Sequence, residues 1–571
     1  MYDLVIRNAL IADGLGSPLM AGDLAVADGR VAAVGRVSGD AAQTLDARGM
    51  VLAPGIIDVH THYDAQLCWD ATCSPSPALG VTTVVIGNCG FGIAPATPET
   101  RGQILANLSV VEAMSLATLE AGVRWEFESF AEYLAMLRRK GAYPNVAAFA
   151  SHSTIRTVVM GRDASRRAAT KAEIASMAAI FRGAMQAGAI GLGSSTFENH
   201  NGAGGVPVPS RLAGDDEFRA LAAVMRAFSH GTMMATCGER TTIEFFEDLA
   251  AISGRPMVYA ALLYNSAQPA RAPGISAACG AARARGHPVY AQASCQPLSM
   301  DFALTGAYPM LVLAGWPQSD DPAALAPVFA DPAFRRAVRE DLKVPRPTRL
   351  FNGNWERVEV TTAAKPENRA FEGRTVAEIA AARGADPLDA FLDVGLADGL
   401  ATSFTAKLLN VEEDKVAELL AVDGNLVSLS DAGAHHTFFC DAGFGMYFLG
   451  HWVRERKRFT LPQAMKKLTS DLADIYGLMD RGRLAPGAWA DMILFDPVAI
   501  RVGKLERVQD LPAGGARLTR RAPGLLGTWV NGVRVFDGAD YMRVKPPGHI
   551  LTEFAKARPT VGMPKTLAAA H

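Results

Sequence analysis

The sequence predicts an α/β protein in which a TIM-type (β/α)8 barrel carries a small β-sandwich domain formed from both chain ends. Three observations predict it: short alternating strands at the N-terminus, repeated apolar strand and helix units after residue 55, and the return of alternation near the C-terminus. We expect the sandwich to comprise residues 1–54 and 485–545, the barrel residues 55–484, and a C-terminal arm residues 546–571.

The two chain ends share one sequence texture. The N-terminal stretches LVIRNALIADG, GDLAVADGRVAAVG and TLDARGMVLAPG are each punctuated by Asp-Gly or Pro-Gly, which are turn signals. ADMILFDP and GTWVNGVRVFDG near the C-terminus alternate in the same way. The final segment is rich in Pro, Lys and Ala without a clear pattern, which is typical of an arm or a partly disordered tail.

Eight apolar segments separated by helical stretches predict the barrel strands. They are IIDVH (56–60), VTTVVIG (81–87), NVAAFAS (145–151), AIGLGSS (189–195), TMMATC (232–237), PMVYAALL (256–263), PVYAQAS (288–294) and NLVSLSD (425–431). The gap between the last two is far longer than an ordinary connection, so we expect an insertion at about 300–424 with helices of its own, for example DPLDAFLDVGLADG.

The composition excludes several classes of partner. Apolar residues make up 49% and charged residues 20%, and 56 Lys and Arg nearly cancel 58 Asp and Glu, so neither nucleic acid nor a membrane is expected as partner. The alternating N-terminus does not resemble a signal peptide. Seven cysteines are an odd, thinly spread set unlike a disulfide framework, so we expect a cytoplasmic protein; a homo-oligomer stays open.

The strongest chemical motif is APGIIDVHTHYD, in which an apolar strand runs into His60 and His62. Residues two apart on a strand point to the same side, so both imidazoles can converge on one ion at the barrel mouth. The alternative is a pair of surface histidines in a loop. The buried character of the preceding strand argues against that alternative.

Asp431 follows the eighth predicted strand in NLVSLSDAGAHH. If the barrel closes, strands one and eight are neighbours, and Asp431 lies beside His60 and His62. A carboxylate there can bind the ion and also shuttle a proton. Taken alone, the sequence Ser-Asp-Ala-Gly is as typical of a plain turn as of a functional carboxylate. His435 and His436 are expected to form hydrogen bonds near Asp431 rather than to ligate metal.

Together with GNCG around Cys89, SHSTIRTVVMG around His152 and the tail GRLAPGAWADMILFDP, these motifs resemble the N-acyl-D-amino-acid deacylase (D-aminoacylase) family of the amidohydrolase superfamily. The similarity covers nearly the whole chain, more weakly in its middle third. It implies a zinc enzyme with one or two divalent ions that hydrolyses the amide bond of a small N-acyl amino acid. The same barrel and histidine pair also serve hydrolases of other linear or cyclic amides or esters, and an inactive barrel is a further alternative.

The resemblance also implies that Cys89 ligates metal through its thiolate, which suits zinc. From the sequence alone, a Cys between Asn and Gly is more often a small buried filler. The family's two further histidines, which end strands five and six, are missing here. MMATCGER and YAALLYNS place Cys237 and Leu263 or a neighbour there. Either Cys237 substitutes as a soft ligand, or one ion is bound through the histidine pair and Asp431.

Five other residues are weaker candidates. His152 ends strand three, where a neutral imidazole could polarise a substrate carbonyl or serve a structural role. His200 lies in the loop TFENHNGAGG, which could close over substrate or simply be solvated. Arg240 or Arg156 could hold a substrate carboxylate through paired hydrogen bonds. Asp431 is the expected base, with His152 or Glu239 next in order.

Overall fold

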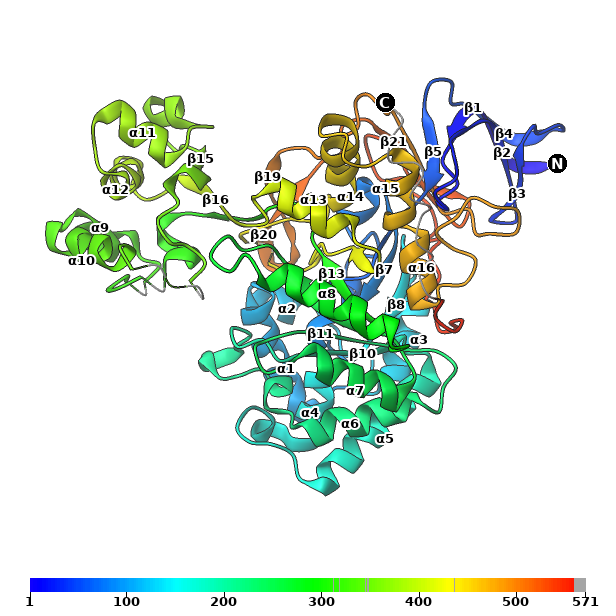
Figure 1. The fold of residues 1–571 in the computed structure, drawn as a ribbon, viewed down its shortest axis with the longest axis horizontal. Helices are drawn as coiled ribbons and strands as arrows, with labels where there is room; N and C mark the ends of the chain where they lie inside the picture. The colour runs from blue at the N-terminus through cyan, green and yellow to red at the C-terminus, as the bar shows by residue number, and fades with distance from the viewer. Residues whose placement is uncertain (312, 318, 345, 347–348, 436, 559–571) are drawn as a thin grey trace.

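The computed structural model describes residues 1–571 except 312, 318, 345, 347–348, 436 and 559–571. Parallel strands form the centre, and helices pack around them (Figure 1). A lobe that holds α9 to α12 projects from one side of this body, and the N-terminal strands lie at the other (Figure 1).

Strands from both chain ends share one sheet, as the matching textures predict. Its order is β22-β21-β18-β5-β1-β2-β3, and β4 pairs with β1. The junction is antiparallel pairing of β18 with β5, where Met492 lies opposite Pro54. The strands are β1 (Tyr2–Ile11), β2 (Met20–Ala27), β3 (Arg30–Gly35), β4 (Ala41–Asp46), β5 (Val51–Pro54), β18 (Met492–Phe495), β21 (Leu525–Val530) and β22 (Val533–Phe536).

Each of the eight segments predicted as barrel strands contains a strand. They form two sheets of parallel strands, here called arcs: β6-β7-β8 and β9-β10-β11-β12-β13-β17. The third segment contributes β8 to one arc and β9 to the other. The strands are β6 (Ile56–Asp58), β7 (Val81–Ile86), β8 (Asn145–Ala148), β9 (Ala150–Ser151), β10 (Gly191–Ser195), β11 (Thr232–Thr236), β12 (Met257–Leu262), β13 (Val289–Ala293) and β17 (Asn425–Val427).

Backbone hydrogen bonds also join the first and last of these segments. The amide of His62 donates to the carbonyl of Ala432 over 2.7 Å, and the amide of Asp431 donates to the carbonyl of His60 over 3.1 Å. Inward-facing side chains from the strands, among them Val59, Met234 and Leu426, form one buried core. One face of the apolar segments is thus buried in this core, and the helices described next cover the other face, as is usual for parallel strands.

The outer helices bury their apolar faces against these strands in a second, larger core, except the last of them, which packs into the first core. Several begin with a side-chain cap that bonds the free amides of the first turn; in α5, Thr170 and Glu173 form a capping box. These helices are α1 (Pro98–Val111), α2 (Leu116–Gly122), α3 (Phe130–Lys140), α4 (His152–Met160), α5 (Lys171–Ala187), α6 (Asp215–Met225), α7 (Ile243–Ser253), α8 (Arg271–Ala284), α13 (Glu413–Ala421), α14 (Phe444–Tyr447), α15 (Leu461–Leu468) and α16 (Ser470–Tyr476).

The lobe lies between the seventh and eighth parallel strands, where an insertion was expected. A three-stranded antiparallel sheet and four helices enclose a core of their own, which includes Phe329, Phe391 and Phe404. Its elements are β14 (Leu298–Phe302), α9 (Pro322–Ala330), α10 (Pro332–Leu342), β15 (Val358–Thr362), α11 (Val376–Arg383), α12 (Pro387–Ala397) and β16 (Ser403–Leu409). A separate hairpin, β19 (Leu505–Leu511) and β20 (Gly515–Arg520), completes the strands of the described chain.

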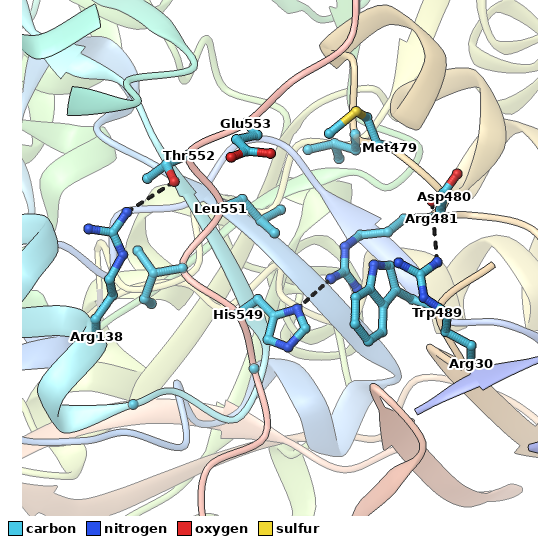
Figure 2. A pocket seen from close by; sticks show the side chains of 14 residues that line it. Arg30, Arg138, Met479, Asp480, Arg481, Trp489, His549, Leu551, Thr552 and Glu553 are labelled. Atoms are coloured by element: carbon cyan, nitrogen blue, oxygen red, sulfur yellow. Dashed lines mark hydrogen bonds and ion pairs between the residues drawn. The ribbon is translucent and has the colours of Figure 1, made fainter. Parts of the chain in front are cut away.

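The described part of the C-terminal segment packs against the parallel strands near their N-terminal ends. Its backbone pairs with Val146 of β8, and Phe554 is buried in the inner core. Arg138 donates to Thr552, and Arg481 contacts His549, at a cavity of about 590 Å³ (Figure 2). The expected arm is therefore an ordered strap as far as residue 558, and its remainder lies outside the described residues.

Two expectations about the whole chain can be compared with the structure. All seven cysteines are buried free thiols, as their odd number suggested. Within the described residues, every helix is too short or too polar to cross a bilayer.

The burial of Phe554 predicts that the strap stabilises the strands it covers. Phe554→Ala should lower the free energy of unfolding by about 3 to 5 kcal/mol, because the ring fills the end of the inner core. Lys556→Ala, at an exposed position two residues on, should change it by no more than about 0.5 kcal/mol. Urea unfolding of both variants followed by circular dichroism measures the difference. Equal stability of the two variants would contradict the prediction.

Candidate active site

Four predicted side chains converge at the C-terminal ends of the parallel strands. Nε2 of His60 lies 3.3 Å from Sγ of Cys89 and 3.0 Å from Oδ1 of Asp431. Nε2 of His62 lies 3.9 Å from the same sulfur and 3.4 Å from the same oxygen. All four side chains are largely buried, so the cluster of ionisable groups lies below the protein surface.

Local backbone geometry aims two of these side chains. Cys89 has φ of 54° and Asp431 has φ of 48°, a left-handed conformation that residues other than glycine rarely adopt. Such strain persists where the surrounding structure holds it, and it concentrates at functional sites. Gly87 precedes Cys89 with φ of 78°, and a Cβ there would lie 2.6 Å from the carbonyl oxygen of Phe149. The turn after β7 therefore requires glycine in order to bring the thiol to the histidines.

The donor set fits a divalent cation such as zinc. The ligand atoms of His60, His62 and Cys89 all lie within 4.8 Å of one another. Nδ1 of His60 lies 2.7 Å from Oε1 of Gln292, whose Nε2 donates to the carbonyl of Ser428. That orientation makes Nδ1 the protonated nitrogen and turns the Nε2 lone pair of His60 toward the cluster. Imidazole, thiolate and carboxylate are the usual ligands of zinc.

Glu112 is a functional candidate that the sequence did not reveal. Its Oε1 lies 3.1 Å from Nδ1 of His62, and the residue is 4% exposed. Neither of its carboxylate oxygens has an aligned hydrogen-bond partner. Carboxylates in this position orient metal-ligating histidines and raise their basicity. Glu112 directly follows α1 in an unremarkable helical sequence, so only the fold brings it to His62.

The four groups shift one another's proton affinities. Burial opposes protonation of His60, but the Cys89 thiolate and Asp431 outweigh it and raise the pKa of His60 to about 10. Burial also opposes ionisation of Cys89 and of Asp431, yet His60 and His62 lower the pKa of both. Without a cation, positive imidazolium is thus the partner of the two anions. A bound cation takes over that role as protons leave.

The structure contradicts the expected ligand role of Cys237. Alternation along β11 turns Thr236 toward the cluster, where its Oγ1 lies 3.0 Å from Sγ of Cys89. Cys237 points the other way, its thiol donates to the carbonyl of Ala235, and burial raises its pKa well above the usual value. The sixth segment presents Ala261 and Leu263 to the site. Cys237 therefore lies outside the cluster of candidate ligands.

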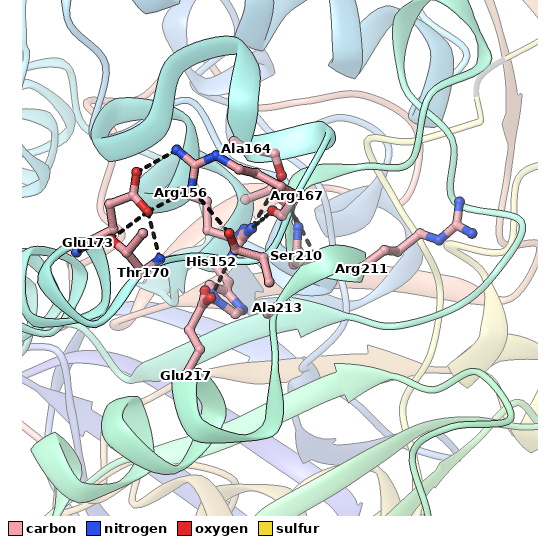
Figure 3. Close-up of polar contacts among 12 residues, drawn as sticks. His152, Arg156, Ala164, Arg167, Thr170, Glu173, Ser210, Arg211, Ala213 and Glu217 are labelled. Atoms are coloured by element: carbon pink, nitrogen blue, oxygen red, sulfur yellow. Dashed lines mark hydrogen bonds and ion pairs between the residues drawn. The ribbon is translucent and has the colours of Figure 1, made fainter.

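His152 and Arg156 belong to a buried polar cluster away from the cavity, so the structure does not support their expected roles in catalysis and substrate binding. His152 is fully buried, with Nδ1 2.8 Å from Oγ of Ser194 and Nε2 2.8 Å from Oε1 of Glu217. Arg156 forms a buried ion pair with the other oxygen of Glu217 (Figure 3). Burial lowers the pKa of His152, so this imidazole is neutral and both its nitrogens are bound within the protein. Neither residue lines the cavity above the cluster.

Arg240 and Glu239 likewise lie away from the cluster. Nη2 of Arg240 donates to the carbonyl of Ala213 over 2.7 Å, and the guanidinium covers the ring of Phe218. Glu239 is exposed and lines a different surface hollow. Both follow strand five as expected, but the chain turns outward there. The proposed carboxylate-binding and reserve-base roles therefore find no support in their positions.

A cavity of about 240 Å³ opens above the cluster. His200 lines it, with Nδ1 2.7 Å from Oγ of Ser195 and its ring between Phe91 and Phe197. Burial lowers the pKa of His200 to about 3, so it is a neutral imidazole. His435 also lines the cavity, whereas His436 lies outside the described residues.

Comparison with known proteins identifies the family. The sequence matches the Amidohydrolase family over residues 43–536. This chain belongs to the amidohydrolase family. It is 29% identical over 542 residues to a D-aminoacylase of Alcaligenes xylosoxydans xylosoxydans, covering 94% of each chain. It is 29% identical to an N-acyl-D-aspartate deacylase of that organism, covering 96% of this amidohydrolase and 95% of the relative.

A solved structure has the same fold. The N-acyl-D-glutamate deacylase of Bordetella bronchiseptica, complexed with zinc and a phosphonate inhibitor, superposes with a TM-score of 0.64 at 26% identity. The match covers 97% of this amidohydrolase and all of the other chain. The whole architecture, lobe included, is thus accounted for by one known fold.

The contact between Glu112 and His62 predicts a role in metal binding. Glu112→Gln keeps the shape and removes the charge, so zinc affinity should fall about 10-fold to 100-fold. Glu120→Gln, at an exposed position in α2, is the matched control and should leave affinity unchanged. Competition with a chromophoric chelator measures both. An unchanged affinity in the Glu112 variant would show that the contact does not orient His62.

The raised pKa of His60 predicts how metal binding depends on pH. Because its pKa without a cation is about 10, His60 is protonated at neutral pH and must lose that proton before it can ligate. Apparent zinc affinity should therefore rise by about 10-fold per pH unit for each proton released between pH 6 and 8. Chelator competition across this range, corrected for the chelator's own protonation, checks the slope. A flat profile would contradict the prediction.

Proposed function

We propose that this amidohydrolase cleaves the amide bond of an N-acyl amino acid in a metal-dependent reaction. The observation that carries the proposal is the convergence of His60, His62, Cys89 and Asp431 at the floor of a cavity large enough for a small substrate. The names of the relatives, D-aminoacylase and N-acyl-D-aspartate deacylase, support the substrate class. The zinc complex of the similar deacylase supports zinc as the ion.

The donor set supports one ion held by the four converging side chains. When bound, a zinc ion lowers the pKa of water toward about 7 and polarises the amide carbonyl. Gln292 contacts Nδ1 of His60 and so fixes the direction of its Nε2 lone pair, and Glu112 lies 3.1 Å from Nδ1 of His62, where it favours the same orientation.

Asp431 is the residue that moves the proton. Its side chain is 19% exposed at the cavity, whereas that of Glu112 is 6% exposed, so Asp431 is the carboxylate of the cluster with better access to substrate. It accepts the proton of the attacking water and then delivers it to the departing nitrogen. His200, a neutral imidazole on the cavity wall, is placed to contact the substrate itself.

We also infer that the two parallel arcs form one closed (β/α)8 barrel. The Thr61 to Ala432 bridge and the backbone bonds beside it support closure between the first and last strands. Within the shared sheet, the junction of β18 with β5 supports a composite β domain of residues 1–54 and 485–545. The mouth of the barrel would then hold the reacting groups, as in other enzymes of this architecture.

The proposed proton transfer is tested by Asp431→Asn. The amide keeps one ligating oxygen but cannot accept the proton, so kcat should fall about 10² to 10⁴-fold while zinc is retained. Release of acetate from N-acetylated D- and L-amino acids, with metal analysis of the same samples, measures both quantities.

A paired variant separates chemistry from metal binding. Changing His60 and His62 together to Ala should abolish both zinc uptake and turnover. If the Asn variant kept zinc and turned over near the parental rate, Asp431 would not be the shuttle. If the double variant kept its zinc, the site itself would be assigned wrongly.

A further inference from the structure

The charges around the cavity are unusual for a site that would receive a carboxylate. Among the described residues that line it, none is Lys or Arg. Its acidic members are Glu112, Asp431 and Asp441, and Cys89 lies beside them. A guanidinium does act on Asp441, but it belongs to Arg520, which is not a lining residue.

The described lining residues therefore supply no cationic side chain that could pair with a substrate carboxylate. Burial lowers the pKa of His200 to about 3 and also lowers the pKa of His435, so neither contributes a positive charge. A substrate carboxylate in this cavity would lose its hydration and meet no cationic side chain, which is costly in a low-dielectric site.

The remainder of the wall is apolar. Phe91 and Phe197 come from loops after the barrel strands, whereas Leu298 and Met300 come from β14 of the lobe, and Phe438 follows Asp431 in the chain. Such a surface binds an aromatic or branched aliphatic group by removing it from water. The cavity therefore offers apolar contact on its walls and reacting groups on its floor, without a cationic anchor.

We propose that the preferred substrates are apolar N-acyl amines and N-acyl amino acids with a blocked carboxyl group, rather than free N-acyl amino acids. This rests on the proposed amide hydrolysis, but it extends the substrate class to N-acyl amines and disfavours a free carboxylate on the amine side. The water oxygen bonds to the acyl carbon as the carbon–nitrogen bond breaks, and the proton taken by Asp431 passes to the nitrogen. The products are the acid of the acyl group and an amine that carries no carboxylate.

Two probes that differ by one carboxylate test the proposal on the zinc-loaded full chain. N-acetyl-2-phenylethylamine has the ring and the amide of N-acetylphenylalanine, whose D- and L-forms serve as the anionic partners. We expect kcat/KM for acetate release to be at least about 10-fold higher for the neutral compound. Equal or faster cleavage of either free acid would overturn the substrate class and leave the proposed amide hydrolysis standing.

Calorimetric binding of the same compounds separates the two proposals further. If none is cleaved, the proposed function fails, yet the dissociation constants still decide the charge preference. Binding of the neutral compound about 10-fold more tightly than either acid supports it. Equal binding, tighter binding of an acid, or no binding of any compound overturns it.

Adding the missing cation provides a second test. Leu298 is half-buried on the cavity wall, and Leu298→Arg places a guanidinium there, while Leu298→Gln is the neutral control of similar polarity. Relative to the control, the Arg variant should raise kcat/KM for the free acid over the neutral amide about 10-fold. The same ratio in both variants would show that charge does not set the preference.

Discussion

The backbone pairing between the segments that end in His62 and Asp431 is the constraint on which the site depends. Two hydrogen bonds, His62 to Ala432 and Asp431 to His60, bring together residues that the sequence separates by most of its length. Gly433 makes this approach possible, since a Cβ there would lie 2.6 Å from the carbonyl carbon of His62 and its φ is 93°. Ser430 adds a buried bond to Asp58 beside the junction. The Asp-Ala-Gly motif therefore pairs the first and last parallel segments and also supplies a candidate metal ligand.

That constraint also concentrates buried charge, which opposes folding unless each charge has a partner. Burying an ion costs several kcal/mol, and breaking a buried pair leaves the other charge uncompensated. The structure offsets this cost by alternating the charges: imidazoles lie between the thiol of Cys89 and the carboxylates of Asp431 and Glu112. A cation that replaces the protons keeps the same alternation. The site is thus suited to metal for the same electrostatic reason that it tolerates its own burial.

The sequence predicts those parts of the site whose geometry is local. His60 and His62 follow an apolar strand at the spacing that sets both on one side, whereas Asp431 lies beyond the end of β17 and reaches them through the backbone pairing. The predicted ligand role of Cys237 is wrong by one residue. Thr236 occupies the position that faces the cluster, and a shift of one residue along a strand turns the side chain to the opposite face. Glu112 shows a second limit, since its partner lies in another element and no pattern within either element records the contact.

Recognition and chemistry come from different parts of this amidohydrolase. The floor of the cavity is built by strand ends that backbone pairing fixes, whereas Leu298 and Met300 on its wall belong to a lobe with its own core. Such a wall can change its residues without disturbing the metal ligands, because the two are stabilised by separate sets of contacts. The strand ends therefore supply the ionisable groups of the site, and the lobe supplies part of the wall that a substrate would contact. Substitutions in the lobe can therefore change which molecules bind without changing the candidate metal ligands.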